Sequence, residues 1–330
     1  MNPAVSHAAS AILLVKTSSM GDVVHLLPAV SDIARHLPQA TIDWAIEESL
    51  AALPGLHPAI ARVIPLAIRR WRRAPLAAAT RGDFASFRSR LQERNYDFVI
   101  DAQGLLKSAW IASMARGEST GPAFGCAREP LAALFYRRRL PVPWRLPAIV
   151  ANRRLVSLAL GIPDASGSPP DYGICAALPA DDLVQPFPYA VLLHSASTAS
   201  KLWPEANWNQ LGAFLEGQGL RCVLPWGSDA ERQRAMRIAE RLGGAVVPRA
   251  MNLAEAASLL SVARLAVGVD SGLTHLAAAV GTPSIALFSG SDPSRTGLVA
   301  MPGRFAVNLG SAGESPSPAI AIKAAGRALA

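Results

Sequence analysis

Short apolar runs alternate along this chain with longer segments whose apolar residues recur at helical spacing. Ala11–Val15 is apolar at every position, which is typical of a strand buried on both faces of a parallel sheet. Phe84–Arg94 instead repeats its apolar residues every three to four positions, as an amphipathic helix does. The alternation predicts an α/β fold in which helices cover both faces of parallel sheets.

These elements form two groups, separated by a proline-rich stretch between about residues 141 and 188. The predicted strands are Ala11–Val15, Thr41–Ile46, Arg62–Pro65, Phe98–Asp101, Tyr189–Leu193, Arg221–Leu224, Leu265–Val269 and Ser284–Phe288. The predicted helices are Val23–Leu37, Phe84–Arg94, Ile149–Leu160, Glu205–Glu216, Asp229–Leu242, Leu253–Leu260, Gly272–Val280 and Ala319–Leu329. The first helix can accommodate Pro28 only near its first turns.

The chain of 330 residues is long enough for two domains, and Ser166–Pro170 has the composition of a linker. The predicted parts are an N-terminal extension (1–10), a first Rossmann-like domain (11–165), a linker region (166–188), a second Rossmann-like domain (189–312) and a C-terminal helix (313–330). Ligands of open α/β sheets bind at the carboxyl ends of the strands. The loops that follow the predicted strands are therefore where chemistry is expected.

Composition excludes several other classes of protein. With 51% hydrophobic residues, the chain has enough apolar surface to fold, so intrinsic disorder is excluded. Its apolar runs fall far short of the ~20 residues that a membrane span needs. The three cysteines are widely spaced, which excludes a disulfide framework or a zinc site and favours a reducing compartment. The first ten residues lack the pattern of a signal peptide, so we expect a cytoplasmic protein.

The whole excess of positive over negative charge lies in the first half of the chain. Residues 1–165 carry 20 Lys and Arg against 12 Asp and Glu, whereas residues 166–330 carry 12 of each. Much of the excess lies in Arg69–Arg73, where four arginines surround Trp71, and in Arg137–Arg139. A solvated charge run is the ordinary explanation of such clusters. A repulsive loop of four arginines nevertheless favours an anionic partner, which could be nucleic acid, an acidic membrane or a large acidic substrate.

The loop Lys16–Asp22 follows the first predicted strand and precedes a helix. Gly21 allows a sharp turn there, and Asp22 lies near the helix N-terminus. An aspartate in this place either caps the helix or serves as a general base, and its position alone leaves both roles open. The loop contains neither GxxxxGK[ST] nor GxGxxG, which weakens an NTPase or dehydrogenase interpretation.

Three loops of the second half have the chemistry of a nucleotide diphosphate site. Asp270–His275 joins a strand to a helix whose N-terminal N–H groups suit phosphate, with Ser271 and Gly272 allowing close approach. Ser197–Pro204 adds hydroxyl groups and Lys201. In the loop after the next strand, Glu231 either binds a ribose diol or is a solvated carboxylate of a first helical turn.

The chain resembles the heptosyltransferase I branch of glycosyltransferase family 9 in five runs that occur in the expected order. These runs are Lys16–Asp22, Arg62–Arg73, Asp101–Leu105, Ala127–Leu131 and Asp270–His275. The resemblance covers about residues 11–330. It implies a GT-B architecture, with two Rossmann-like, doubly wound parallel-sheet domains facing a central cleft. It also implies inverting transfer of L-glycero-D-manno-heptose from ADP-heptose to the first Kdo of Kdo2-lipid A in lipopolysaccharide inner-core biosynthesis. Neither a covalent intermediate nor a metal or other cofactor is expected.

The resemblance assigns roles to particular residues and makes Asp22 the catalytic base. The implied donor-binding residues are Ser197, Thr198, Lys201, Glu231, Met251, Asp270, Ser271, Gly272 and His275. The implied acceptor-binding residues are Ser18, Ser19, Arg69, Arg70, Arg72, Arg73, Lys107 and Arg128. The chain departs from the family pattern at Ala196–Ser200, where members carry two threonines and acidic residues, and at Ser271, where a threonine is usual.

The expected partners are ADP-heptose, Kdo2-lipid A and the anionic cytoplasmic face of the inner membrane, with the protein a monomer peripherally associated there. One alternative is heptosyltransferase II or another ADP-sugar transferase of the family. A GT-B sugar-nucleotide epimerase and a basic nucleic-acid-binding protein are more remote alternatives. No RRM, KH, zinc or helix-turn-helix signature supports nucleic-acid binding.

Overall fold

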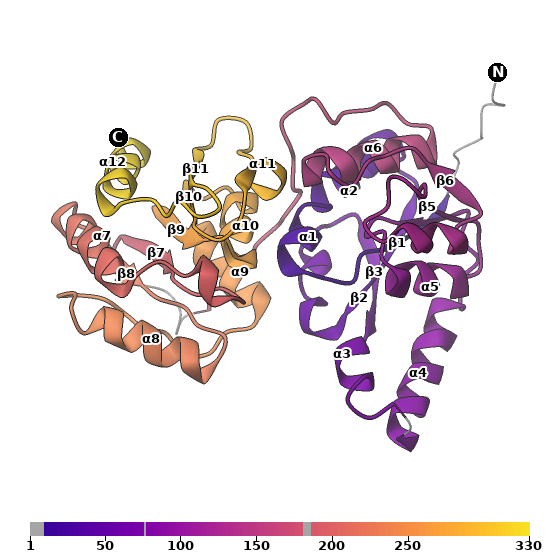
Figure 1. Cartoon of the computed structure of the whole chain (residues 1–330), viewed down its shortest axis with the longest axis horizontal. Coiled ribbons are helices and arrows are strands. Elements are labelled where there is room, and N and C mark those ends of the chain that lie inside the picture. Colours follow the sequence, from indigo (N-terminus) through magenta and orange to yellow (C-terminus); the bar gives the residue numbers. More distant parts are fainter. Residues whose placement is uncertain (1–9, 76, 181–185) are drawn as a thin grey trace. The chain divides into compact units, whose positions relative to one another are not determined.

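The computed structural model describes residues 10–75, 77–180 and 186–330. The chain divides into two compact units, Met1–Gly173 and Ile174–Ala330, and each contains one parallel sheet (Figure 1). The division falls within the predicted linker region 166–188. Residues 1–9 of the expected N-terminal extension lie outside the described residues. No described helix is long and apolar enough to cross a membrane.

The sheet of the first unit has the strand order β3-β2-β1-β4-β5-β6. Its strands are β1 (Ala11–Val15), β2 (Thr41–Glu47), β3 (Ile60–Leu66), β4 (Phe98–Asp101), β5 (Ser119–Pro122) and β6 (Arg138–Leu140). The chain winds outward from β1 in one direction and continues from β4 in the other. The topological switch point, where such sheets bind ligands, therefore lies between the carboxyl ends of β1 and β4. Val15 pairs with Asp101 at that edge.

Helices cover both faces of this sheet, with α2 and α6 on one face and α4 and α5 on the other (Figure 1). The helices are α1 (Met20–Val24), α2 (Leu27–His36), α3 (Ile68–Trp71), α4 (Ala78–Leu91), α5 (Leu106–Met114) and α6 (Ala148–Leu160), with 3₁₀ turns η1 (Glu48–Leu50), η2 (Pro54–Leu56) and η3 (Pro130–Phe135). A buried ion pair joins α2 to α6, with Nε of Arg153 2.7 Å from Oδ2 of Asp32.

The prediction of a single helix at Val23–Leu37 is wrong. The chain instead forms α1 and α2, which are separated at His25 and Leu26. Pro28 lies in the first turn of α2, where its missing N–H costs no intrahelical hydrogen bond. The break makes α1 a short helix of its own, and Asp22 belongs to it.

The sheet of the second unit has the strand order β11-β10-β9-β7-β8. Its strands are β7 (Tyr189–Leu193), β8 (Arg221–Val223), β9 (Leu265–Val269), β10 (Ser284–Phe288) and β11 (Ala306–Gly310). Its helices are α7 (Glu205–Gly217), α8 (Asp229–Ala239), α9 (Leu253–Ser261), α10 (Gly272–Ala279), α11 (Pro293–Thr296) and α12 (Pro318–Leu329), with a 3₁₀ turn η4 (Ala199–Lys201). The switch point of this sheet lies between β7 and β9.

Four central strands match their predicted bounds, whereas several short helices and less apolar strands were missed. The strands predicted at Ala11–Val15, Tyr189–Leu193, Leu265–Val269 and Ser284–Phe288 have the same bounds in the structure. The missed helices and strands are α3, α5, α11, β5, β6 and β11. β5, β6 and β11 are polar, charged or half-exposed, so they lack the continuous apolar run of a central parallel strand.

Candidate active-site residues in the two units

Asp22 is held at the start of α1 by Ser19. The backbone N–H and the hydroxyl of Ser19 both donate to Oδ2 of Asp22, at 3.1 and 3.0 Å. Among the described residues, none donates a hydrogen bond to Oδ1. One carboxylate oxygen therefore stabilises the helix N-terminus while the other stays open to accept a proton, so capping and general-base roles are compatible.

Lys16 keeps Asp22 ionised. Burial alone would raise the pKa of Asp22, but the nearby charge of Lys16 and the hydrogen bonds from Ser19 hold it below the ordinary value of 3.8. Lys16 is itself buried, and its Nζ donates to the carbonyl of Ala102 at 2.6 Å and to Oδ1 of Asn152 at 3.2 Å. Asp22 is consequently a carboxylate at neutral pH, ready to take a proton.

Gln103 fixes the loop that carries Ser18 and Ser19. Its Oε1 accepts hydrogen bonds from the backbone N–H and the hydroxyl of Thr17, at 2.8 and 2.7 Å. Its Nε2 donates to the carbonyl of Ser18 at 2.8 Å. The buried carboxylate of Asp101 in turn accepts the backbone N–H of Gln103 at 2.8 Å. Sequence reasoning assigned Gln103 no role; the available signal was its polar amide beside the switch point.

Part of the predicted acceptor cluster comes together beside this loop. Lys107 donates to Oγ of Ser18 at 3.2 Å. Burial lowers the pKa of Lys107; the charge of Glu47 opposes this, and the charges of Arg69 and Arg72 lower the pKa further, so Lys107 lies close to both arginines. Arg128 lies next to Gly104, with its backbone N–H 3.5 Å from where a Cβ of Gly104 would be. An anionic ligand here would relieve the mutual repulsion of these charges.

Two other arginines of the predicted cluster stand apart. Arg70 forms ion pairs with Glu48, at 3.1 Å, and with Asp83, so its charge is already balanced. Among the described residues, nothing joins Arg73 to Lys107 or Ser18. The acceptor role expected for Arg70 and Arg73 therefore gains no support from the geometry, and it stays a prediction that rests on the resemblance.

The second arginine run, residues 137–139, is largely engaged within the fold. Arg138 donates to the backbone carbonyls of Ala159 and Leu158, at 2.8 and 2.9 Å. Arg139 donates to the carbonyl of Ala133 at 2.7 Å and lies over the ring of Phe124. The protein itself therefore supplies hydrogen-bond acceptors for these two side chains, so they contribute less than the run at Arg69–Arg73 to the argument for an anionic partner.

Asp270, directly after β9, contacts side chains from three other positions in the second unit. Its Oδ2 lies 2.6 Å from Nζ of Lys201 and accepts the hydroxyl of Ser291 at 2.5 Å, and its Oδ1 lies 3.5 Å from Nε2 of His275. Burial would raise the pKa of Asp270, but hydrogen bonds with His275, Lys201 and Ser291 hold it well below its usual range. Ser291, in the loop after β10, is the residue here that sequence reasoning missed.

The first turn of α10 packs unusually close to β9. A Cβ at Gly268 would lie 2.1 Å from Oγ1 of Thr274, so only glycine allows this approach. Thr274 donates to the carbonyl of Val269 at 2.6 Å, and its Oγ1 lies 3.0 Å from the hydroxyl of Ser271. Ser271 and Gly272 thereby present the N-terminal end of α10 at the switch point, where the helix dipole favours an anion.

The remaining predicted donor residues are spread around the same edge of the sheet. Ser197 and Thr198 are exposed in the loop before η4, and Met251 is half-buried just before α9. In Glu231, Oε2 accepts the backbone N–H of Gly227 at 2.7 Å, so that oxygen stabilises the start of α8. Within the described residues, no hydrogen bond or ion pair joins these four side chains to Asp270. Their donor roles stay predictions.

His194 lies buried at the end of β7, with Nδ1 2.8 Å from Oγ of Ser195. Burial and the charge of Arg234 lower the pKa of His194 to about 4, so the ring is neutral at physiological pH and can orient that hydroxyl. No group of three or more His, Cys, Asp or Glu in the described parts of the chain is arranged to hold a metal ion.

Comparison with known proteins identifies the family. Residues 84–319 match the family described as Glycosyltransferase family 9 (heptosyltransferase). The chain is 46% identical over 304 residues to lipopolysaccharide heptosyltransferase 1 of Pseudomonas aeruginosa, covering 91% of this chain and 83% of that relative. The chain belongs to glycosyltransferase family 9. It is therefore a heptosyltransferase, as the sequence predicted.

Solved structures confirm the fold of this family 9 chain. The structure of E. coli heptosyltransferase WaaC with ADP superimposes with a TM-score of 0.88 and 38% identity, covering 96% of this chain and 99% of that one. The predicted architecture of two parallel-sheet α/β domains is thereby confirmed. Lipopolysaccharide heptosyltransferase 1 of Salmonella typhimurium is 43% identical to this chain over 287 residues, covering 87% of this chain and 90% of that relative. Lipopolysaccharide heptosyltransferase 2 of the same organism is 24% identical over 317 residues, covering 86% of this chain and 84% of that relative.

Proposed function

We propose that this heptosyltransferase transfers L-glycero-D-manno-heptose from ADP-heptose to the first Kdo of Kdo2-lipid A, in the inner core of lipopolysaccharide. Two observations carry the proposal together: the first unit holds an ionised, half-open carboxylate at its switch point, and the second unit holds a phosphate-type site at its own. The greater identity to heptosyltransferase 1 than to heptosyltransferase 2 supports the choice of acceptor over the heptosyltransferase II alternative.

Asp22 acts as the general base of the proposed transfer. Its open Oδ1 takes the proton of the acceptor hydroxyl as that oxygen attacks the anomeric carbon of heptose. Because a single base suffices for direct displacement, the reaction inverts the anomeric configuration and forms no covalent intermediate. Ser18, Ser19 and Lys107, with Arg69, Arg72 and Arg128 nearby, orient the acceptor through its phosphates and carboxylates.

The second unit binds ADP-heptose and receives the charge that develops on the leaving ADP. The N–H groups at Ser271 and Gly272 are suited to the diphosphate, and Lys201 supplies a point charge beside it. Asp270 holds Lys201 and His275 in place for that contact. These fixed donors can stabilise the leaving group without a metal ion, so we propose that transfer continues in the presence of a chelator.

The basic surface of the first unit is also suited to the anionic cytoplasmic face of the inner membrane. Each basic residue near such a surface contributes about 1 kcal/mol of attraction, and the attraction weakens as salt screens it. We propose that the protein associates peripherally there, as a monomer. Sedimentation with anionic vesicles at low salt should carry the protein down, and sedimentation that is equal with neutral vesicles would contradict this.

Acceptor-dependent release of ADP tests the proposed function. ADP-heptose and Kdo2-lipid A together should give ADP and a heptosylated lipid whose new linkage is inverted, as measured by NMR, and neither substrate alone should suffice. Turnover only with a heptosylated acceptor would favour heptosyltransferase II. Consumption of the sugar nucleotide without any acceptor would favour an epimerase, and salt-sensitive binding of nucleic acid without ADP-sugar binding would favour the remaining alternative.

A further inference from the structure

An apolar groove opens on the first unit between α3, α4 and α5. Its volume is about 340 Å³, which lies within the range of small-molecule sites. Aromatic rings form much of its lining: Phe84 and Trp110 stack with their ring centres 5.5 Å apart, and Trp71 meets Phe84 edge-on at 5.6 Å. Trp110 is 43% exposed, so a large apolar side chain is available at the surface of the groove.

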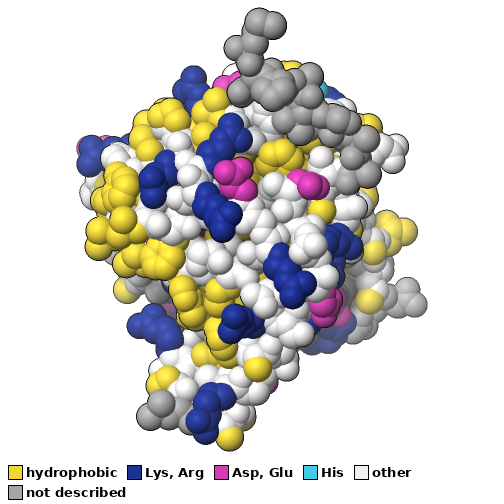
Figure 2. All heavy atoms as spheres, turned by 90° about the vertical axis from the view of Figure 1, so that its right-hand side faces the viewer, with side chains coloured by type: hydrophobic (Ala, Val, Ile, Leu, Met, Phe, Trp, Pro, Cys, Tyr) yellow, Lys and Arg dark blue, Asp and Glu magenta, His cyan; other side chains and the backbone are white. Residues whose placement is uncertain are grey.

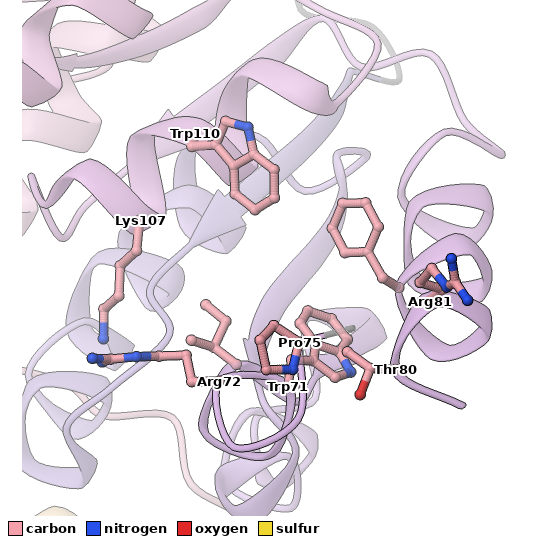
Figure 3. Close-up of a pocket in the computed structure, with 9 residues that line it drawn as sticks. Trp71, Arg72, Pro75, Thr80, Arg81, Lys107 and Trp110 are labelled. Carbon is pink, nitrogen blue, oxygen red and sulfur yellow. The ribbon is translucent and has the colours of Figure 1, made fainter. Parts of the chain in front are cut away.

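The polar groups of the groove are confined to its two ends. Figure 3 shows Lys107 and Arg72 converging at one end and Thr80 and Arg81 at the other, with Trp71 and Trp110 on the walls between them. A sugar or a nucleobase would leave its hydrogen-bonding groups without partners along those walls, and that desolvation is costly. Hydrocarbon needs no such partners, so the middle of the groove is suited to an alkyl chain.

The cationic end of the groove is directly connected to the loop of the candidate base. Lys107, whose ammonium group lies at that end, donates to Ser18, and Ser18 is adjacent to the residue that holds Asp22. An amphiphile with its anionic head against Lys107 and Arg72 would therefore have its head beside Asp22 and its hydrocarbon between the tryptophans. The geometry thus matches one molecule that carries both parts.

Apolar side chains continue beyond the groove. Leu106 on α5 is 41% exposed, and Leu131 and Leu134 on η3, which packs against α5, are more exposed still. Figure 2 shows that the surface on this side of the first unit mixes hydrophobic with Lys and Arg side chains and carries few acidic ones. Such a surface attracts an anionic lipid headgroup through its Lys and Arg side chains, and its exposed apolar side chains can contact hydrocarbon.

We propose that the groove binds one acyl chain of the anionic lipid acceptor while Lys107 and Arg72 bind its head. The proposal rests on the proposed function, because it takes the acceptor to be an acylated glycolipid. It assigns to Trp71, Phe84 and Trp110 the recognition of hydrocarbon, a role separate from that of the cations.

Steady-state kinetics of Trp110→Ala tests the groove with two acceptors, Kdo2-lipid A in detergent and its fully deacylated headgroup. The variant should raise KM for the acylated acceptor about tenfold, because apolar area buried against the chain is lost, and should leave KM for the headgroup and kcat for both unchanged. Leu158→Ala on α6, on the opposite face of the sheet, is the matched control: Leu158 is 40% exposed, and the change should alter neither KM. An equal rise with both acceptors would overturn the proposal.

Fluorescence quenching tests the groove without turnover, so it separates this proposal from the proposed function. An alkyl phosphate that carries bromine at mid-chain should quench tryptophan fluorescence more than its unbrominated counterpart, and Trp110→Ala should reduce that difference. Equal fluorescence with both probes would overturn the groove even if heptosyl transfer is established. Weaker binding of Trp110→Ala to vesicles with unchanged KM for the acylated acceptor would also overturn it, in favour of a general membrane contact.

Discussion

Each unit holds a carboxylate beside the switch point of its sheet, but the two carboxylates are engaged differently. Asp22 follows β1 and Asp270 follows β9, each beside a topological switch point. Within the described parts of the chain, the hydrogen bonds to Asp22 all reach Oδ2, and the charge that most lowers its pKa belongs to the buried Lys16. Both oxygens of Asp270 are engaged, by Lys201, Ser291 and His275.

This difference separates two uses of one residue type. A carboxylate with an open oxygen can accept a proton during a reaction. A carboxylate whose oxygens are both occupied cannot do so without losing those partners, but it can hold a cation and a histidine in fixed positions. This difference in engagement is what the proposed roles of the two carboxylates, general base for Asp22 and ligand organisation for Asp270, require.

Replacement of Lys201 should produce the largest effect in the second unit. In Lys201→Ala the cation is lost and the buried charge of Asp270 is left to repel the diphosphate, so affinity for ADP should fall about 100-fold by calorimetry. In the double variant Lys201→Ala/Asp270→Asn the repulsion is removed, and about tenfold of that affinity should return. A double variant that binds no better than Lys201→Ala would show that Asp270 does not act through Lys201.

Gly268→Ala should disturb the second unit through its backbone. The new Cβ would overlap Oγ1 of Thr274 and push the start of α10 away from β9, which should cost about 1–3 kcal/mol of unfolding free energy and about tenfold in ADP affinity. Gly217→Ala at the end of α7, where nothing lies within 4 Å, is the matched control and should change neither quantity appreciably. Unchanged ADP affinity in Gly268→Ala would separate α10 from the nucleotide site.

Gln103→Leu should impair the first unit alone. Loss of the amide releases Thr17 and Ser18, so the loop of Asp22 is no longer fixed, and kcat should fall about tenfold while ADP affinity is unchanged. Gln92→Leu is the matched control, because Gln92 also donates to a backbone carbonyl, that of Met114, but away from this loop. A loss of ADP affinity in Gln103→Leu would contradict the division of roles between the units.

Lys16→Met should give the smallest effect, a change in pH dependence. Asp22 is active when ionised, so activity falls as pH drops through its pKa, and Lys16 holds that pKa low. Without Lys16 the acid limb of kcat should move to higher pH, with a smaller change at neutral pH. Lys323→Met, an exposed change on α12, should leave the profile in place. A Lys16→Met profile identical to the wild type would mean that another group controls the acid limb.

The sequence predicted the central strands and both strand-end loops because the signals there are local. Buried parallel strands are continuous apolar runs, and Gly, Ser and Asp after such runs mark turns and helix starts. Pairing between distant segments is not local. Nothing in the sequence placed Glu48 and Asp83 beside Arg70, or Ser291 beside Asp270, and these contacts decide which charges remain for a ligand.

The groove illustrates the same limit. Trp71 was noted only for its arginine neighbours, and the helix that carries Trp110 was not predicted. Their convergence with Phe84 depends on how α3, α4 and α5 pack on the sheet. Spacing along the chain carries no information about this packing, so the apolar site was visible only in three dimensions.

The most direct test of the division of roles is the rate of acceptor-dependent ADP release by Asp22→Asn at saturating ADP-heptose, measured beside its ADP affinity. Asparagine keeps the shape of the side chain and its oxygen for Ser19 but cannot take the acceptor proton. We predict that kcat falls by about 100-fold or more while ADP affinity stays within about twofold of the wild type. A variant that keeps its turnover, or that loses ADP affinity in proportion to kcat, would contradict Asp22 as the base.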